Sequence, residues 1–200
     1  MPSFYWLPYR DAGWLTDAYS RANIARGDRM LPFLNGGSAA GSGVPAGTWD
    51  DVRENDSIFL PVHGHKYTTS KVSWSVGDQL VSWTAGTFAD HLRLKLDQNH
   101  AASHHFHLLA CFGANNITFF HQSFGFRLAS EMKARGLRGD MTAYMGATHM
   151  QAVKGHEGQI GTSRLTAAPY FLMQKMRGKG GAPSHVTLLT RDAGKTWPIG

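Results

Sequence analysis

Two side chains that could carry out nucleophilic chemistry, His63 and Cys111, each stand at the end of a short apolar run. Cys111 is the only cysteine in the chain and follows residues 106–110, FHLLA. His63 follows residues 58–62, IFLPV, and lies 48 positions earlier. A thiolate is a good nucleophile at neutral pH, and a nearby imidazole can take the thiol proton and later protonate a leaving amine. The two residues therefore predict a thiol nucleophile served by a histidine base.

The elements around these residues are expected to bring them together. An apolar run of strand length bounded by turn residues is typical of a buried parallel strand. Between the two runs, Phe88, Leu92 and Leu96 are spaced by four, which predicts a helix over residues 84–96. The order strand, helix, strand is a βαβ crossover, which makes the two strands parallel. Because parallel strands present their carboxyl ends at one edge of an open α/β sheet, the histidine and the cysteine should lie side by side.

The oxyanion that forms when a thiolate attacks a carbonyl group needs two hydrogen-bond donors. The backbone amides of Gly64 and Cys111 are expected to provide them, and the lack of a Cβ at Gly64 lets a substrate approach the backbone. Small residues beside the thiol leave room for a peptide. The residues expected to border the substrate are Gly113, Asn115 and His65.

The remaining pattern predicts an α/β fold with a mostly parallel sheet flanked by helices, in a single domain over residues 1–200. A flexible glycine-rich loop is expected around residues 34–47, with polar turns at 148–163. The other expected elements are strands at 3–9, 141–147 and 185–190, a hairpin at 66–76, and helices at 14–25 (with Asp11 or Thr16 as its cap), 124–135 and 167–176.

Composition narrows the classes of protein. The chain has 20 Lys and Arg against 14 Asp and Glu, a formal charge of +6. The charges form no block, which favours a solvated basic surface over a specific nucleic-acid site. A single cysteine excludes internal disulfides and multi-cysteine zinc sites. No cleavable signal and no membrane-spanning run are seen, so we expect a cytoplasmic protein or one exported by a signal-independent system.

His-Gly after one apolar strand and Ala-Cys-x-Gly after a later one resemble the caspase–hemoglobinase group of cysteine proteases. The separation of 48 residues is close to the caspase spacing of about 50, although Leu109 stands where caspases have glutamine. The resemblance covers residues 57–147. It implies a three-layer caspase-like fold and a cysteine endopeptidase in which His63 and Cys111 act as a dyad through a thioester acyl-enzyme.

The compact size is similar to that of bacterial members of this group, the self-processing cysteine protease domains of secreted toxins. The resemblance implies a protein or peptide substrate, and no cofactor for the chemistry itself. It also implies an activator, either an anion such as inositol hexakisphosphate or a metal. No specific nucleic acid or membrane partner is expected, and the oligomeric state stays open. The basic residues that could bind an anionic activator are Lys154, Arg164, Lys175, Arg177 and Lys179.

Two alternatives to a protease stay open. A metal-dependent hydrolase or metal-binding module could use the chain's clustered histidines, although neither cluster has carboxylates or thiolates arranged as partners. A non-catalytic interaction domain on the same fold could bind an acidic partner through its basic surface. The clustered histidines are His63, His65, His104, His105 and His107.

Overall fold

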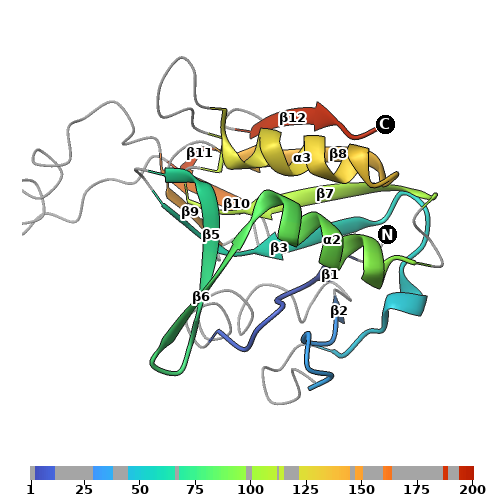
Figure 1. The fold of residues 1–200 in the computed structure, drawn as a ribbon, viewed down its shortest axis with the longest axis horizontal. Coiled ribbons are helices and arrows are strands. Elements are labelled where there is room, and N and C mark those ends of the chain that lie inside the picture. Colours follow the sequence, from blue (N-terminus) through green and yellow to red (C-terminus); the bar gives the residue numbers. More distant parts are fainter. Residues whose placement is uncertain are drawn as a thin grey trace, which may run out of the picture.

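The computed structural model describes residues 3–11, 29–37, 45–65, 68–97, 101–111, 113–114, 122–144, 147–150, 160–163, 187–188 and 194–200. Its main element is a six-stranded sheet in the order β12-β8-β7-β3-β1-β2 (Figure 1). Five strands are parallel and β12 is antiparallel, at one edge. The predicted α/β class with a mostly parallel sheet is therefore confirmed. The strands are β1 (Ser3–Tyr5), β2 (Arg29–Met30), β3 (Ser57–Pro61), β7 (Ser103–Leu109), β8 (Arg138–Tyr144) and β12 (Gly194–Pro198).

The predicted strand–helix–strand unit is present as β3, α2 (Ala85–Lys95) and β7. The Thr84 hydroxyl caps the helix by accepting a hydrogen bond from the Thr87 N–H at 3.2 Å. β3 and β7 are parallel neighbours, with a register that ends at the pair Pro61 and Leu109. This unit determines which residues meet at the carboxyl edge of the sheet.

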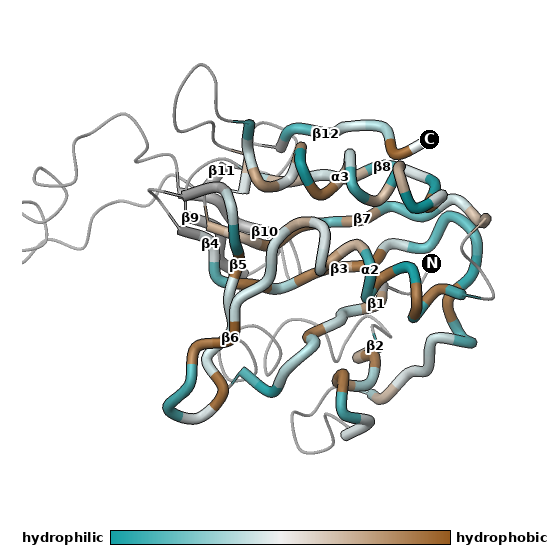
Figure 2. Tube along the Cα trace, in the orientation of Figure 1, coloured by the Kyte–Doolittle hydropathy of each residue, from teal (hydrophilic) through white to brown (hydrophobic). Residues whose placement is uncertain are grey.

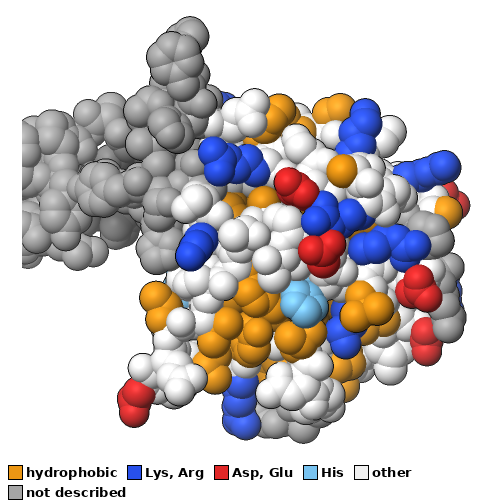
Figure 3. All heavy atoms as spheres, in the orientation of Figure 1, with side chains coloured by type: hydrophobic (Ala, Val, Ile, Leu, Met, Phe, Trp, Pro, Cys, Tyr) orange, Lys and Arg blue, Asp and Glu red, His pale blue; other side chains and the backbone are white. Residues whose placement is uncertain are grey.

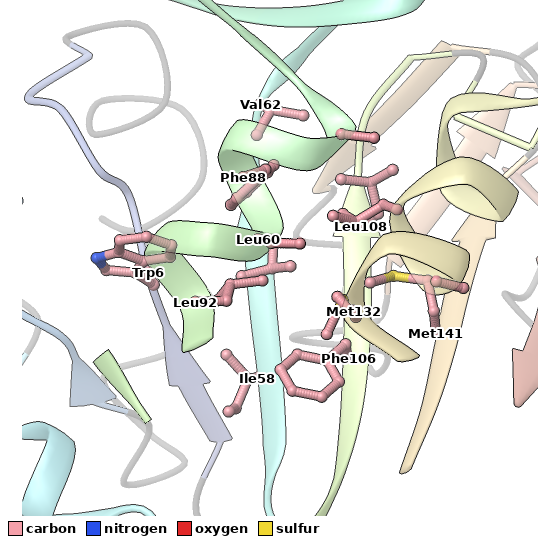
Figure 4. Packing of buried hydrophobic residues seen from close by; sticks show 14 of the residues in the cluster. Trp6, Ile58, Leu60, Val62, Phe88, Leu92, Phe106, Leu108, Met132 and Met141 are labelled. Atoms are coloured by element: carbon pink, nitrogen blue, oxygen red, sulfur yellow. The ribbon is translucent and has the colours of Figure 1, made fainter. Parts of the chain in front are cut away.

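One face of the sheet is apolar and is covered by two helices, α2 and α3 (Phe124–Ala134). Successive side chains of a strand point to opposite faces, so alternate residues of β3 and β7 enter this core. Ile58, Leu60, Phe106 and Leu108 are fully buried there, against helix residues such as Leu92 (Figure 4). Burial of each such side chain stabilises the fold by about 1.5–3 kcal/mol. This packing holds the helices on the sheet and sets the register of the strands.

The opposite face of the sheet is more polar. Phe59 on β3 stacks with Tyr5 on one side and with His107 on the other, at ring-centroid distances of 4.8 and 4.5 Å. Nearer the start of the strands, His105 pairs with Asp140 at 2.8 Å, and both side chains are at least one-third exposed. Within the described residues, both helices lie on the first face. The three-layer arrangement expected from the family resemblance is therefore not confirmed in these parts of the chain.

Two small antiparallel sheets accompany the main one. The first has the order β4-β5-β6 and contains a hairpin of β5 and β6 in which Gly77, at φ 58°, begins the two-residue turn. Glycine at that place suits the type II′ turn preferred by two-residue hairpins. The hairpin predicted within residues 66–76 was wrong, because residues 68–76 form a single strand, β5, that pairs on both sides. The second sheet has the order β11-β10-β9. The elements are β4 (His63–His65), β5 (Thr68–Val76), β6 (Gln79–Thr84), β9 (Ala147–Met150), β10 (Ile160–Ser163), β11 (Thr187–Leu188) and a 3₁₀ helix, η2 (Trp49–Asp51).

Several predicted boundaries were wrong. The first strand ends at Tyr5 rather than at residue 9, and β8 begins at Arg138 rather than at 141. β8 starts early because Gly136, at φ 76°, reverses the chain directly after α3 and buried Leu137 then leads into the sheet. β12 was not predicted, and β9 and β10 lie where polar turns were expected. The expected helices at 14–25 and 167–176, and residues 38–44 of the glycine-rich loop, lie outside the described residues. In the described part of the chain, no helix is long and apolar enough to cross a membrane.

The buried ring of His107 makes the stability of the fold depend on pH. Burial lowers its pKa from 6.5 to about 4; the Asp140 carboxylate raises the pKa by a smaller amount, and His105 adds a smaller lowering effect. The unfolded chain takes up this proton first, so stability should fall as the pH drops from about 6.5 to about 4, by roughly 3 kcal/mol, and then level off. Urea unfolding followed by tryptophan fluorescence at several pH values measures this change.

His107→Gln should remove that part of the pH dependence, whereas His105→Gln should retain it because the buried ring is still present. Parallel pH profiles for wild type and His107→Gln would contradict the assignment.

Candidate active site

The register of the two central strands places His63 and Cys111 at the same level of the sheet. Pro61 and Leu109 are the last paired residues, and each candidate residue stands two positions beyond its member of that pair. The Val62 N–H donates to the Leu109 carbonyl oxygen at 3.2 Å, which extends the contact between the chains past the end of the sheet. Cys111 then begins a turn and is partly exposed.

Gly64 lies directly against the backbone of Cys111. A Cβ placed on Gly64 would stand 2.0 Å from the Cys111 carbonyl oxygen and 3.1 Å from its nitrogen, which no side chain can do without displacing the neighbour. Only glycine therefore permits this approach. The contact brings the residue after the histidine and the backbone of the cysteine together, so the two predicted oxyanion donors belong to adjoining peptide groups.

A buried carboxylate, Asp11, holds the His63 ring. Oδ2 of Asp11 lies 2.8 Å from His63 Nε2 and also accepts a hydrogen bond from the Ser75 N–H at 2.7 Å. The Asp11 side chain is 1% exposed, whereas that of His63 is 43% exposed. The ring is thus oriented from its buried side while its other edge faces outward. One carboxylate oxygen connects the segment after β1, the start of β4 and the end of β5.

Aromatic side chains pack around the segment that carries Asp11 and around the end of β3. Tyr9, two residues before Asp11, contacts the rings of Trp74 and Trp83, with centroids 5.7 and 5.5 Å away. The indole N–H of Trp74 donates to the Pro61 carbonyl oxygen at 3.0 Å, close to the end of β3. Rings packed in this way leave few alternative rotamers, so the carboxylate and the strand end are held in fixed positions.

The turn that contains Cys111 is hydrogen-bonded to the first turn of α3 and to β8. The Gly113 N–H donates to Ala110 O at 3.1 Å, and Gly125 N–H, in the first turn of α3, donates to Gly113 O at 2.9 Å. The Ala114 N–H donates to Tyr144 O at 3.0 Å. Gly113 was predicted to border the oxyanion or substrate, but it is buried against Ala110 and its N–H is used within the turn. Its role in this structure is to close the turn.

The other predicted residues either lie outside the described parts of the chain or have partners elsewhere in the fold. The side chain of His65, all of Asn115 and the five basic residues considered for an anionic activator lie outside the described parts of the chain. His105 and His107 contact Asp140 and Tyr144 on the more polar sheet face, and His104 is buried on the opposite face of β7. Among the residues that the structure describes, no group of three or more His, Cys, Asp or Glu side chains could hold a metal ion.

Asp11 is the site residue that the sequence interpretation missed, because it was considered only as a helix cap. His63 and Cys111 were selected because each follows a predicted parallel strand, and the same criterion would have selected Asp11. Asp11 follows the first strand segment, and that strand is the direct neighbour of β3. A polar residue shortly after a third parallel strand was thus the available signal.

Comparisons of the chain with protein-family models, with curated proteins and with solved structures gave no match. The geometry of the described residues is therefore the basis for inferring a function.

Replacing Gly64 by alanine should disrupt the site, because the added methyl group would collide with the Cys111 carbonyl oxygen. We expect a loss of about 1–3 kcal/mol or more in stability, as for other overpacked positions. Thermal unfolding and the rate of Cys111 alkylation by iodoacetamide measure the two effects.

Gly86→Ala, on α2, is the matched control. The nearest atom to its added Cβ would lie 3.5 Å away, so stability should be unchanged or higher by up to about 1 kcal/mol. If Gly64→Ala were as stable as wild type, with an equally reactive thiol, the close contact would not exist in solution.

Proposed function

We propose that this chain is a cysteine endopeptidase in which Cys111 is the nucleophile and His63 the general base and acid. The observation that carries the proposal is the contact of Gly64 with the Cys111 backbone, beside a histidine that is held by a buried carboxylate. A nucleophile, a base and a residue that orients the base are the parts required for acyl transfer by a thiol.

His63 Nε2 is bound to Asp11, which leaves Nδ1 as the ring nitrogen that takes the thiol proton. In the proposed reaction the sulfur of Cys111 bonds to the carbonyl carbon of the peptide, and the proton on His63 passes to the leaving amine as the C–N bond breaks. The product is a thioester and a free amine. A water molecule, deprotonated by His63, then attacks the thioester and restores the thiol.

The amides of Gly64 and Cys111 are the proposed donors to the oxyanion. Both belong to backbone that is fixed by packing, so no reorganisation is needed as charge develops on the substrate oxygen. Asp11 is proposed as a positioning residue, because it holds the ring in one orientation and stabilises the imidazolium formed during the reaction. We also propose the finer features that the family resemblance implies. These are a three-layer caspase-like fold and a role as a self-processing domain or a secreted effector, as in the bacterial members.

The metal-hydrolase alternative receives less support. The histidines of β7 are divided between the two faces of the sheet, and the two on the polar face are hydrogen-bonded to separate partners. The interaction-domain alternative is distinguished by the reactivity of the thiol, which needs no knowledge of the substrate.

Cys111→Ala should abolish cleavage of a proteome-derived peptide library, followed by mass spectrometry, and leave the circular dichroism spectrum unchanged. His63→Ala should lose most of the activity, without a further loss in the double variant. His105→Ala is the matched control, because His105 is equally exposed and also lies 2.8 Å from a carboxylate, Asp140. Cleavage that persists in Cys111→Ala, or a wild-type thiol that reacts with iodoacetamide like an ordinary cysteine, would end the proposal.

Asp11→Asn should reduce kcat by about 100-fold or more, with a smaller effect on KM, because the orienting charge is lost while the shape is kept. It should also move the pH profile of Cys111 alkylation to higher pH, since the imidazolium beside the thiolate is no longer stabilised. Asp56→Asn is the matched control. Asp56 is the other buried aspartate among the described residues and caps the Arg53 N–H at 2.7 Å, at the far end of β3.

Asp56→Asn should lower stability without moving the alkylation profile. Equal profiles for wild type and Asp11→Asn would show that Asp11 serves the fold alone.

A further inference from the structure

The outer strand of the β4-β5-β6 sheet lacks the features that usually prevent strands of different molecules from pairing. β6 lies at the edge of that sheet and has six residues, QLVSWT, without a charge or a proline. Its Leu80 side chain is 62% exposed. Soluble proteins normally protect an edge by keeping it short or by placing lysine or proline on it. β6 does neither.

The other edges in the described residues are protected. β12, at one end of the main sheet, carries Lys195 and Pro198, and β2, at the other end, has two residues. The edges of the small sheets are also short, with two to four residues in β4, β9 and β11. β6 is therefore the longest edge strand described here, and it is uncharged.

The backbone of β6 has hydrogen-bonding groups directed away from β5. Val76 and Gln79 flank the two-residue turn and form a hydrogen-bonded pair. Hydrogen-bonded and non-hydrogen-bonded pairs alternate along an antiparallel ladder, so Val81 directs its backbone groups toward β5. Leu80 and Ser82 direct theirs outward. The outer edge thus offers a regular row of donors and acceptors to another strand.

Apolar surface accompanies this edge on both faces of the hairpin. Leu80 is exposed on one face, and Tyr9, Val76 and Val81 lie partly exposed on the other, packed against the core. Figure 2 shows hydrophobic colour on the β6 side of the hairpin beside a hydrophilic tip. In Figure 3, apolar side chains form a continuous area between the hairpin and α2. A strand added to β6 would cover part of this surface.

We propose that β6 pairs antiparallel with β6 of a second copy of this chain, around a two-fold axis near Leu80 and Val81. Such an interface is self-complementary, because the same strand lies on both sides of the axis. Each chain carries a formal charge of +6, so two copies meet with least repulsion where the surface is uncharged. With the axis at Leu80, the pairing places the two Leu80 side chains opposite each other and continues the small sheet across both molecules.

An extended substrate is a weaker candidate for this edge. β6 is two strands away from β4, which carries His63, so a peptide paired with the outer edge of β6 would lie roughly 14 Å from the strand of the proposed base. The pairing therefore leaves the proposed catalytic residues accessible. It also stands independently of the proposed function, because neither Cys111 nor its reactivity takes part.

Sedimentation equilibrium of the full chain, over a range of concentrations, tests the pairing. Wild type and Cys111→Ala should both reach twice the chain mass of 22.0 kDa. Leu80→Lys and Leu80→Glu should each raise the dissociation constant of the dimer about tenfold or more, because like charges then face each other at the axis. A mixture of the two variants should restore the dimer. Leu94→Lys is the matched control, since Leu94 is 69% exposed on α2, away from the edge.

Ser82→Pro gives a second test that is independent of charge, because it removes an outward N–H without removing a bond to β5. It should weaken the dimer, while circular dichroism shows the monomer folded. A chain that stays monomeric at all concentrations would overturn the proposal, even if β6 were found to bind an extended peptide. A dimer that tolerates both Leu80→Lys and Ser82→Pro would overturn it as well.

Discussion

The parallel register between β3 and β7 is the constraint on which the candidate site depends. It ends at Pro61 and Leu109, so that His63 and Cys111 follow at the same level and Gly64 meets the cysteine backbone. Side chains alternate along a strand, so a slip of one residue would turn Ile58 and its core neighbours to the polar face. The apolar core therefore specifies the register, and the register specifies the site. Stability and chemistry are coupled through one alignment of two strands.

The positions around that alignment are held by groups that have little freedom. The rings of Tyr9, Trp74 and Trp83 pack against one another. The Trp74 indole N–H also donates a hydrogen bond to the Pro61 carbonyl oxygen, at the end of β3. On the other side, α3 and β8 bind the turn that contains Cys111. Sites that act on a substrate without reorganising need such a second layer of support. Here that layer comes from a sheet, a helix and a separate hairpin.

The sequence predicted the elements that have a local pattern. It missed those that depend on contacts between segments distant in the chain. Two apolar runs ended by a reactive residue and a glycine predicted β3, β7 and their crossover helix, because short apolar runs bounded by turn residues and a four-residue apolar spacing are local signals. Asp11 was not recognised, since its partners His63 and Ser75 are distant in sequence and its aromatic segment reads as a longer strand. β12 has one large apolar side chain, Trp197, so its pairing with β8 had no periodic signature. Which strands lie at the edge of a sheet can be determined only when the order of the strands in that sheet is known.

The anchoring of the cysteine turn to β8 has a consequence for how the chain is made. Synthesis releases the amino-terminal segment first, and the contacts of the Cys111 turn are complete only after Tyr144 has left the ribosome. Until then the residues around Cys111 belong to an incomplete sheet. A nascent chain would therefore hold this turn unanchored until β8 has been made, and the segment around Cys111 would take its final conformation only late in synthesis.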